Sequence, residues 1–300
     1  RLLELDILGR AAAQALIGSG QVAALVGEAG VGKSRIFLEF LRAPAMQDWL
    51  VLEAGAESYG RATSYFPLIE LLTRYFEIHG RDDAHTAREK IFAKLLTFRE
   101  ERLLAQAPFF LGALGMGANN DVWTNLTPAE RRLKIFDALK QLLIRESQRQ
   151  PLCLIFEDLH WIDAETLAFL EMFVDSIPGA RVLLLVNYRL EHQSTWTRRS
   201  YFSEMHVQPL PASSTDEMLE VLLGSHVELD PIKRSLINIT EGNPLFLEEC
   251  VQSLIERGVL AGTPGEWRPL GSIPAGFVPR SIVALLAARI DRLSPELKKL

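Results

Sequence analysis

The chain has 300 residues, of which 48% are hydrophobic and 23% are charged, with a formal net charge of −6. This composition is typical of a folded globular protein, and the acidic balance argues against a chain-wide attraction to nucleic acid or anionic lipid. Cys153 and Cys250 have neither the number nor the spacing of a disulfide framework or metal site. No apolar run approaches the roughly 18 residues of a membrane span, and a signal-peptide pattern is missing. We therefore expect a cytoplasmic protein without a membrane partner.

Short segments rich in Val, Leu and Ile indicate strands that are buried on both faces of a parallel sheet. They are 21–27, 49–56, 152–158, 180–188 and, less regularly, 204–210. Apolar residues at helical spacing follow or separate them at 33–43, 128–149 and 163–175. Thr127 and Pro128 form an N-cap followed by proline at the first helical position. The alternation predicts an α/β fold with helices on both faces of the sheet.

Two further regions interrupt or follow this pattern. The stretch 59–125 reads as a helical insertion, with helices expected near 66–78 and 86–105. After Pro209 only helices are expected, at 213–224, 230–239 and 244–258, followed by the loop "AGTPGEW" and another helix from Val278. The predicted domains are therefore an α/β domain over 1–208, a helical domain over 209–276 and the start of a third domain over 277–300.

The stretch "GEAGVGKS" satisfies the phosphate-loop pattern G-x-x-x-x-G-K-[ST], and a predicted strand precedes it while a predicted helix follows it. Gly30 and Gly32 allow backbone N–H groups to converge on phosphates, and the helix N-terminus adds partial positive charge. Lys33 is expected to reach the β- and γ-phosphates, and Ser34 to offer its hydroxyl to Mg²⁺. The predicted fold is thus a P-loop NTPase fold. The nucleotide contacts expected here are Gly27, Glu28, Ala29, Gly30, Val31, Gly32, Lys33, Ser34 and Arg35.

A pair of acids ends the third predicted strand in "LCLIFEDLHWID". One carboxylate is expected to hold Mg²⁺ through water and the other to prepare the attacking water. The position relative to the strand favours Glu157 for the metal and Asp158 for catalysis, although the reverse assignment stays open. Asp163 is expected to cap the next helix, and His160 and Trp161 to pack beneath the turn.

Two weaker signals lie further along the chain. At the end of the fourth strand, "VNYR" offers Asn187 or Arg189 as a sensor of the γ-phosphate. In "TEGNPLFLEE", Asn243 can cap a helix that Pro244 opens, and this local pattern by itself requires no ligand.

The strings "GEAGVGKS", "LIFEDLHWID", "VNYR" and "EGNPLF" together resemble the signal-transduction ATPases with numerous domains (STAND), a branch of the AAA+ superfamily. "ESYGRATSYFPLIELLTRYFEI" and "LLLVNYRLEHQSTW" resemble in particular the ATPase segment of bacterial proteins that carry a class III adenylate/guanylate cyclase. The resemblance implies that Pro244 belongs to a helical lid over the nucleotide, that the third domain is a winged helix, and that Leu8, Gly9 and Arg10 border the adenine. Ala11 stands where the family commonly has an acid, and Leu190 where it commonly has proline.

These observations predict a regulatory switch that binds ATP or ADP with Mg²⁺ and hydrolyses ATP slowly. The chain starts at Arg1 and ends within a helical pattern, so we expect it to be part of a longer polypeptide with sensor and output domains, which forms a homo-oligomer on activation. Arg198 and Arg199 are both candidates for an arginine finger that acts in trans, and neither is assigned this role. Two alternatives stay open: a DNA-associated AAA+ ATPase, which should have a basic face, and a scaffold that binds ATP without cleaving it.

Replacing Lys33 with alanine tests the phosphate loop. Because Lys33 is the side-chain charge that the motif directs at the β- and γ-phosphates, Lys33→Ala should weaken ATP binding at least tenfold, or about 1.4 kcal/mol. Calorimetric titration with Mg·ATP measures the change, and an unchanged affinity would contradict a phosphate loop at this position.

Overall fold

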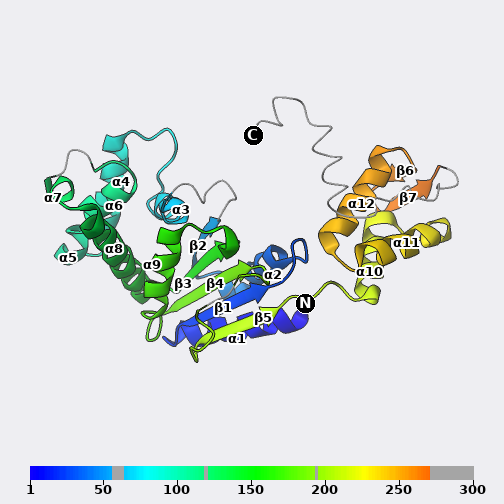
Figure 1. Ribbon diagram of the computed structural model, residues 1–300, viewed down its shortest axis with the longest axis horizontal. Coiled ribbons are helices and arrows are strands. Elements are labelled where there is room, and N and C mark those ends of the chain that lie inside the picture. Colours follow the sequence, from blue (N-terminus) through cyan, green and yellow to red (C-terminus); the bar gives the residue numbers. More distant parts are fainter. Residues whose placement is uncertain (56–63, 118–120, 193–194, 271–300) are drawn as a thin grey trace. The chain divides into compact units, whose positions relative to one another are not determined.

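The computed structural model describes residues 1–55, 64–117, 121–192 and 195–270 (Figure 1). The chain divides into two compact units, which are described separately below. The first contains residues 1–26 and 33–206, and the second contains residues 27–32 and the chain from Val207. Within the described residues, the structure has no helix that is both long and apolar enough to cross a membrane.

A five-stranded parallel sheet forms the centre of the first unit, in the order β2-β3-β4-β1-β5. Its strands are β1 (Gln21–Val26), β2 (Leu50–Gly55), β3 (Leu152–Glu157), β4 (Val182–Tyr188) and β5 (Phe202–His206). Side chains of β1 and β4 are buried throughout, because helices cover both faces of the sheet. The predicted α/β class with a parallel sheet is confirmed.

Helices form the two outer layers of this sheet (Figure 1). On one face, α1 (Leu2–Leu16) packs against β1, β4 and α2 (Lys33–Leu41). The other face carries α3 (Phe66–Tyr75), α8 (Pro128–Arg149) and α9 (Ala164–Val174), whose apolar side chains share one core with every second residue of the central strands. Thr127 and Glu130 form a capping box at the start of α8, which confirms the predicted cap.

The helical insertion is more divided than predicted. Its remaining helices are α4 (Ala84–Leu96), α5 (Glu101–Leu104), α6 (Ala107–Ala113) and α7 (Asp121–Thr124). The single helix expected over 86–105 is wrong, because Arg99 has a left-handed backbone with φ of 56° and separates α4 from α5. Part of the stretch "LGALGMGANND" is helical, since α6 extends into it.

The second unit contains α10 (Ala212–Leu223), α11 (Asp230–Thr240), α12 (Pro244–Glu256) and an antiparallel pair, β6 (Leu260–Thr263) and β7 (Glu266–Pro269). The three helices enclose a core that includes Leu236, Leu247 and Cys250. The loop expected at "AGTPGEW" is instead a hairpin, because Gly265 takes φ of 82° in the turn. The helix from Val278 and the winged helix over 277–300 lie outside the described residues.

Two parts of the first unit differ from the sequence-based expectation. Helix α1 was not predicted, although Leu8, Ala11 and Ala15 form its buried stripe. The last strand is β5 over Phe202–His206 rather than 204–210. It lies at the edge of the sheet and buries few side chains, so it lacks the continuous apolar run that marks a central strand.

Alanine substitutions at two glycines test the packing of the second unit. Gly242 has φ of +78°, and a Cβ there would lie 2.0 Å from the carbonyl oxygen of Leu210. Gly258 has φ of +67° but open space around it, so it is a matched control. Gly258→Ala should cost about 1–2 kcal/mol of unfolding free energy through its left-handed backbone alone. Gly242→Ala should cost roughly 2–5 kcal/mol, since overpacking adds to that strain. Equal losses in urea denaturation would contradict the close approach.

Candidate nucleotide site

Three side chains meet at the carboxyl edge of the sheet. The Ser34 hydroxyl, in the first turn of α2, donates a hydrogen bond to the Glu157 carboxylate at the end of β3. Asn187 of β4 donates from Nδ2 to the same carboxylate oxygen at 2.9 Å. Its own Oδ1 accepts from the backbone N–H of Asp158 at 2.8 Å. Asn187 is therefore a buried bridge that fixes both the side chain of Glu157 and the backbone of Asp158.

Strand register explains why these residues meet. In the parallel pairing, Phe156 lies opposite Val186 and Val26 opposite Tyr188. The carboxyl ends of β1, β3 and β4 therefore lie at one edge, where the phosphate loop follows β1, the acid pair ends β3 and Asn187 lies near the end of β4.

The phosphate loop has the backbone that its glycines predict. Gly30 and Gly32 take φ of +81° and +94°, which are unfavourable for residues with a Cβ. Lys33 begins α2 and is 92% buried, with an exposed fraction of 8%. Ser34 and Arg35 are exposed on the first turn of the same helix.

Asp158 differs from Glu157 in its surroundings. Its backbone is left-handed, with φ of 56° and ψ of 49°, and its side chain is 49% exposed. His160 Nδ1 lies 3.9 Å from Asp158 Oδ1. Burial lowers the pKa of His160, while the carboxylate of Asp158 acts in the opposite direction, so the imidazole is neutral at neutral pH. A half-exposed carboxylate beside a neutral imidazole is suited to accept a proton from water.

Of the two sensor candidates, Asn187 contacts the acid pair directly, whereas Arg189 lies against the turn that follows it. The guanidinium of Arg189 lies 6.0 Å from the centre of the Trp161 ring, in cation–π geometry. The pattern "VNYR" had offered both residues. The register of β3 and β4 sets Asn187 beside Glu157.

Asp163 confirms its predicted capping role and has one contact that the sequence did not indicate. Its carboxylate accepts from the backbone N–H groups of Glu165 and Thr166, both at 3.1 Å, at the start of α9. It also accepts from the backbone N–H of Tyr65 at 3.0 Å. This bond joins α3, at the border of the insertion, to the turn that follows the acid pair. No local pattern reports a contact across 98 residues.

The residues expected at the adenine lie inside α1. Leu8 is fully buried in the core, whereas Gly9 and Arg10 are exposed, and Arg10 forms an ion pair with Asp6 at 3.0 Å. Of the two arginine-finger candidates, Arg199 is held by Asp175 at 2.6 Å and Arg198 is exposed.

Within the second unit, the first turn of α12 holds the phosphate loop. Asn243 Nδ2 donates to the carbonyl oxygen of Ala29 at 2.9 Å, and the backbone N–H of Leu245 donates to that of Gly30 at 3.2 Å. Asn243 Oδ1 accepts from the backbone N–H of Phe246 at 3.2 Å, which confirms the predicted cap. A Cβ on Gly30 would lie 2.7 Å from Asn243 Oδ1, so this approach requires glycine. Pro244 thus stands between two residues that contact the loop.

The oxygen atoms of Ser34 and Glu157 are suitable ligands for Mg²⁺. This hard cation prefers oxygen ligands and is usually held by one or two protein groups together with phosphate oxygens and water. A serine hydroxyl and a carboxylate in direct contact supply such oxygens on one side of the phosphate loop.

One curated relative is an uncharacterized protein of Rhizobium meliloti (strain 1021), which is 25% identical over 252 residues. The alignment covers 83% of this chain and 24% of the relative, so the chain spans about a quarter of the relative's length.

Two solved structures are similar to this chain at low sequence identity. A chain from the structure of Drosophila ORC bound to DNA has a TM-score of 0.40 and 11% identity, covering 85% of this chain and 52% of that one. The structure of C. elegans PCH-2 has a TM-score of 0.43 and 13% identity, and the match covers 85% of this chain and 62% of that one.

A family comparison carries more weight. The model of the AAA ATPase domain matches residues 1–186, which contain the phosphate loop and the acid pair. Such a match supports nucleotide binding and ATPase activity in general. Because the family model matches more than half of its length, this chain belongs to the AAA ATPase domain family.

Proposed function

We propose that this chain is an ATP-operated regulatory switch of the STAND branch within a longer signalling protein. The contact of Ser34 and Asn187 with the Glu157 carboxylate carries the proposal, because it assembles a metal-side hydroxyl, an acid and a polar bridge beside the phosphate loop. We further propose that 1–208 is the ATPase module, 209–276 its helical lid, and 277–300 the start of a winged-helix domain. The much longer curated relative supports a module within a larger chain.

In the proposed mechanism each residue has a separate task. Lys33 binds the β- and γ-phosphates, and Ser34 and Glu157 hold Mg²⁺, which neutralises phosphate charge when bound. Asp158 accepts the proton of the attacking water, and Asn187 fixes the backbone of Asp158 in place. Slow turnover suits a switch, because the ATP and ADP states must persist long enough to be read by neighbouring domains.

The contacts of α12 support a coupling between the nucleotide and the helical domain. In a planar trans peptide the C=O and N–H groups point in opposite directions. When Asn243 and Leu245 bind the carbonyl oxygens of Ala29 and Gly30, they therefore direct the N–H groups of Gly30 and Val31 away from α12. Two loop donors are thus oriented by the segment "GNPLF", so binding of a phosphate and the position of α12 should depend on each other.

Charge and cysteine chemistry bear on partners and location. The basic residues of α8 are largely engaged, as in the pairs Arg132–Glu165 and Arg145–Glu100, which does not favour the alternative of a DNA-bound ATPase. Both cysteines are buried free thiols, which supports our proposal of a cytoplasmic protein. We also propose that the protein forms a homo-oligomer on activation. Its partners are sensor and output domains of the same full-length chain, and the full-length protein is of the adenylate/guanylate cyclase or transcription-regulator type.

Substitutions of the acid pair test the division of roles. Asp158→Asn should keep ATP affinity but slow single-turnover hydrolysis by at least about 100-fold, because it removes the proton acceptor. Glu157→Gln should instead make nucleotide binding less dependent on Mg²⁺. Asp48→Asn is the control, since Asp48 is exposed and distant in sequence from the motifs. If Asp158→Asn hydrolyses ATP at the parental rate, the roles assigned to Glu157 and Asp158 are wrong or reversed. If the unsubstituted protein does not hydrolyse ATP, the alternative of a scaffold that binds ATP without cleaving it is favoured.

Proline substitutions test the coupling through α12. Pro244→Ala should loosen the first turn of α12, whose residues bind the loop, so release of a fluorescent ADP analogue in stopped flow should accelerate. Pro231→Ala is the matched control, because Pro231 opens α11 in the same unit and belongs to a different helix. If both variants release ADP at the parental rate, Pro244 only begins a helix and the lid proposal fails.

A further inference from the structure

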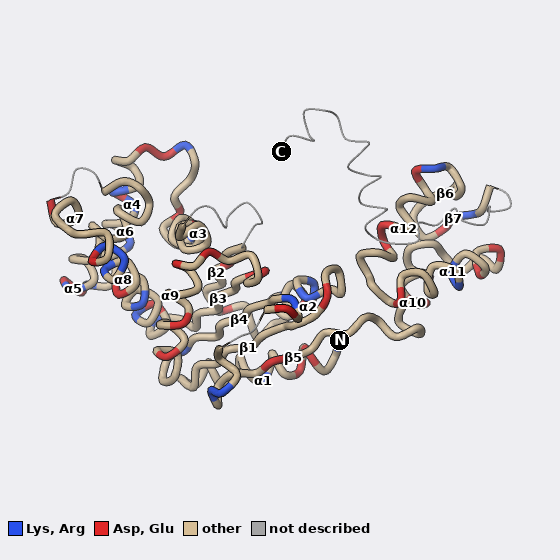
Figure 2. Tube along the Cα trace, in the orientation of Figure 1, with Lys and Arg blue, Asp and Glu red and all other residues tan. Residues whose placement is uncertain are grey.

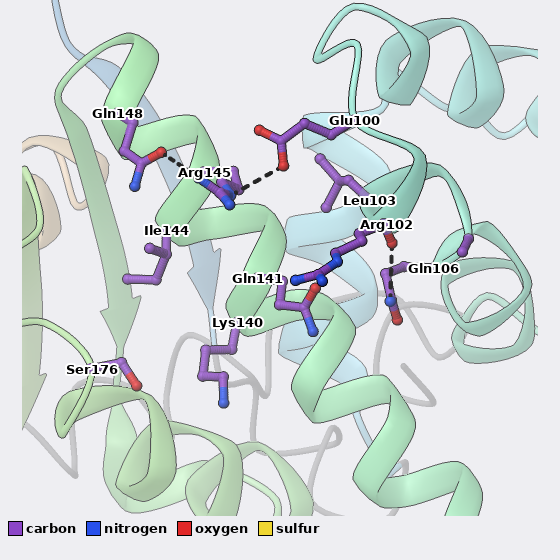
Figure 3. A pocket seen from close by; sticks show the side chains of 11 residues that line it. Glu100, Arg102, Leu103, Gln106, Lys140, Gln141, Ile144, Arg145, Gln148 and Ser176 are labelled. Carbon is purple, nitrogen blue, oxygen red and sulfur yellow. Dashed lines mark hydrogen bonds and ion pairs between the residues drawn. The ribbon is translucent and has the colours of Figure 1, made fainter.

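A cavity lies in the first unit, between α5 of the insertion and the long helix α8 (Figure 3). Its volume is about 710 Å³. Pockets for small ligands typically measure roughly 300–1,000 Å³. None of the residues that line it belongs to the proposed nucleotide site. We call it the α5–α8 cavity, and its lining includes Glu100, Arg102, Ala105, Lys140, Gln141 and Ile144.

The wall formed by α8 is locally basic in a chain of net charge −6. The helix sequence from Pro128 to Arg149 contains six basic and three acidic residues, and Figure 2 shows the basic residues along its course. One of the acids, Glu146, is buried and accepts a hydrogen bond from Tyr75 inside the core. Of the basic residues of α8, Lys140 and Arg145 line the cavity.

Most polar groups of the cavity already have partners. Arg145 pairs with Glu100 at 3.2 Å, and Lys140 lies 3.3 Å from one carboxylate oxygen of Asp137. Gln141 donates to the other oxygen of Asp137 at 2.6 Å. These two cations and two acids balance, so they leave no net charge for a ligand to neutralise.

Arg102 is the exception. Its side chain extends from α5 toward Gln141 of α8 (Figure 3), and it is exposed. Across the described ranges its guanidinium forms no ion pair, and Gln106 binds only its backbone carbonyl, at 3.1 Å. A guanidinium presents five N–H donors in a planar fork that matches a carboxylate or a phosphate. One uncompensated cation thus projects into a cavity whose other charges cancel.

Apolar side chains stand beside this charge. Ala105 of the α5 end and Ile144 of α8 line the same cavity. A ligand that gains from both features carries an anionic head and an apolar body. We propose that the α5–α8 cavity binds a small organic anion, with its carboxylate or phosphate head on Arg102 and its apolar part against Ile144. This inference does not depend on the proposed switch.

The test uses the full 300-residue chain with the Lys33→Ala substitution, so that the phosphate loop does not compete for the probe. Phenyl phosphate and benzoate are titrated by ligand-observed NMR, and benzyl alcohol is the neutral probe of similar shape. One or both anions should bind saturably and at least tenfold more tightly than benzyl alcohol. The preference between the two distinguishes a phosphate from a carboxylate ligand.

Two arginine variants assign the binding to the cavity. Arg102→Gln in the same background should weaken binding of the anion at least tenfold, whereas Arg88→Ala, which removes an exposed arginine of α4, should leave it unchanged. Circular dichroism checks that each variant is folded, and Arg102→Lys should keep part of the affinity. Binding that survives Arg102→Gln, or the lack of saturable binding in the Lys33→Ala background, would each overturn the proposal.

Discussion

The Glu157 carboxylate is shared between Ser34 and Asn187, and the rest of the site depends on this sharing. It connects the helix that follows β1, the end of β3 and the end of β4 at one edge of the sheet. Because Asn187 is buried and uses both ends of its amide, a slip of β4 by one residue would turn it to the other face. The all-buried strands oppose such a slip, since it would expose or bury the wrong side chains along their whole length.

The same edge connects the site to the helical insertion. Asp163 follows the acid pair by five residues, caps α9 and binds the backbone of Tyr65 at the start of α3. Tyr65 has a left-handed backbone with φ of 67°, a conformation that costs roughly 1–2 kcal/mol for a non-glycine residue. The bond to a buried carboxylate offsets that cost. A change in the turn after Glu157 and Asp158 therefore acts directly on the first helix of the insertion.

Sequence reasoning succeeded where the physical signal is local. The turn between β1 and α2, the central strands and the caps at Thr127, Asp163 and Asn243 each follow from a few neighbouring residues. It failed at β5, whose edge position removes the apolar run, and it did not predict α1, whose buried stripe consists mainly of alanine. The contact of Asn187 with Glu157 required strand register, and the bond from Asp163 to Tyr65 required the tertiary structure.

The contacts of α12 give a physical reason for the segment "GNP" beyond its local capping pattern. A helix N-terminus has backbone N–H groups without intrahelical partners, and Leu245 uses one of them on the carbonyl oxygen of Gly30. Asn243 caps the helix with its amide oxygen and holds Ala29 with its amide nitrogen. The loop therefore depends on the α12 terminus for the carbonyl partners that fix its peptide planes. Since the same planes carry the N–H groups that point away from α12, this terminus and a phosphate bound as proposed would act on opposite sides of the same peptide units.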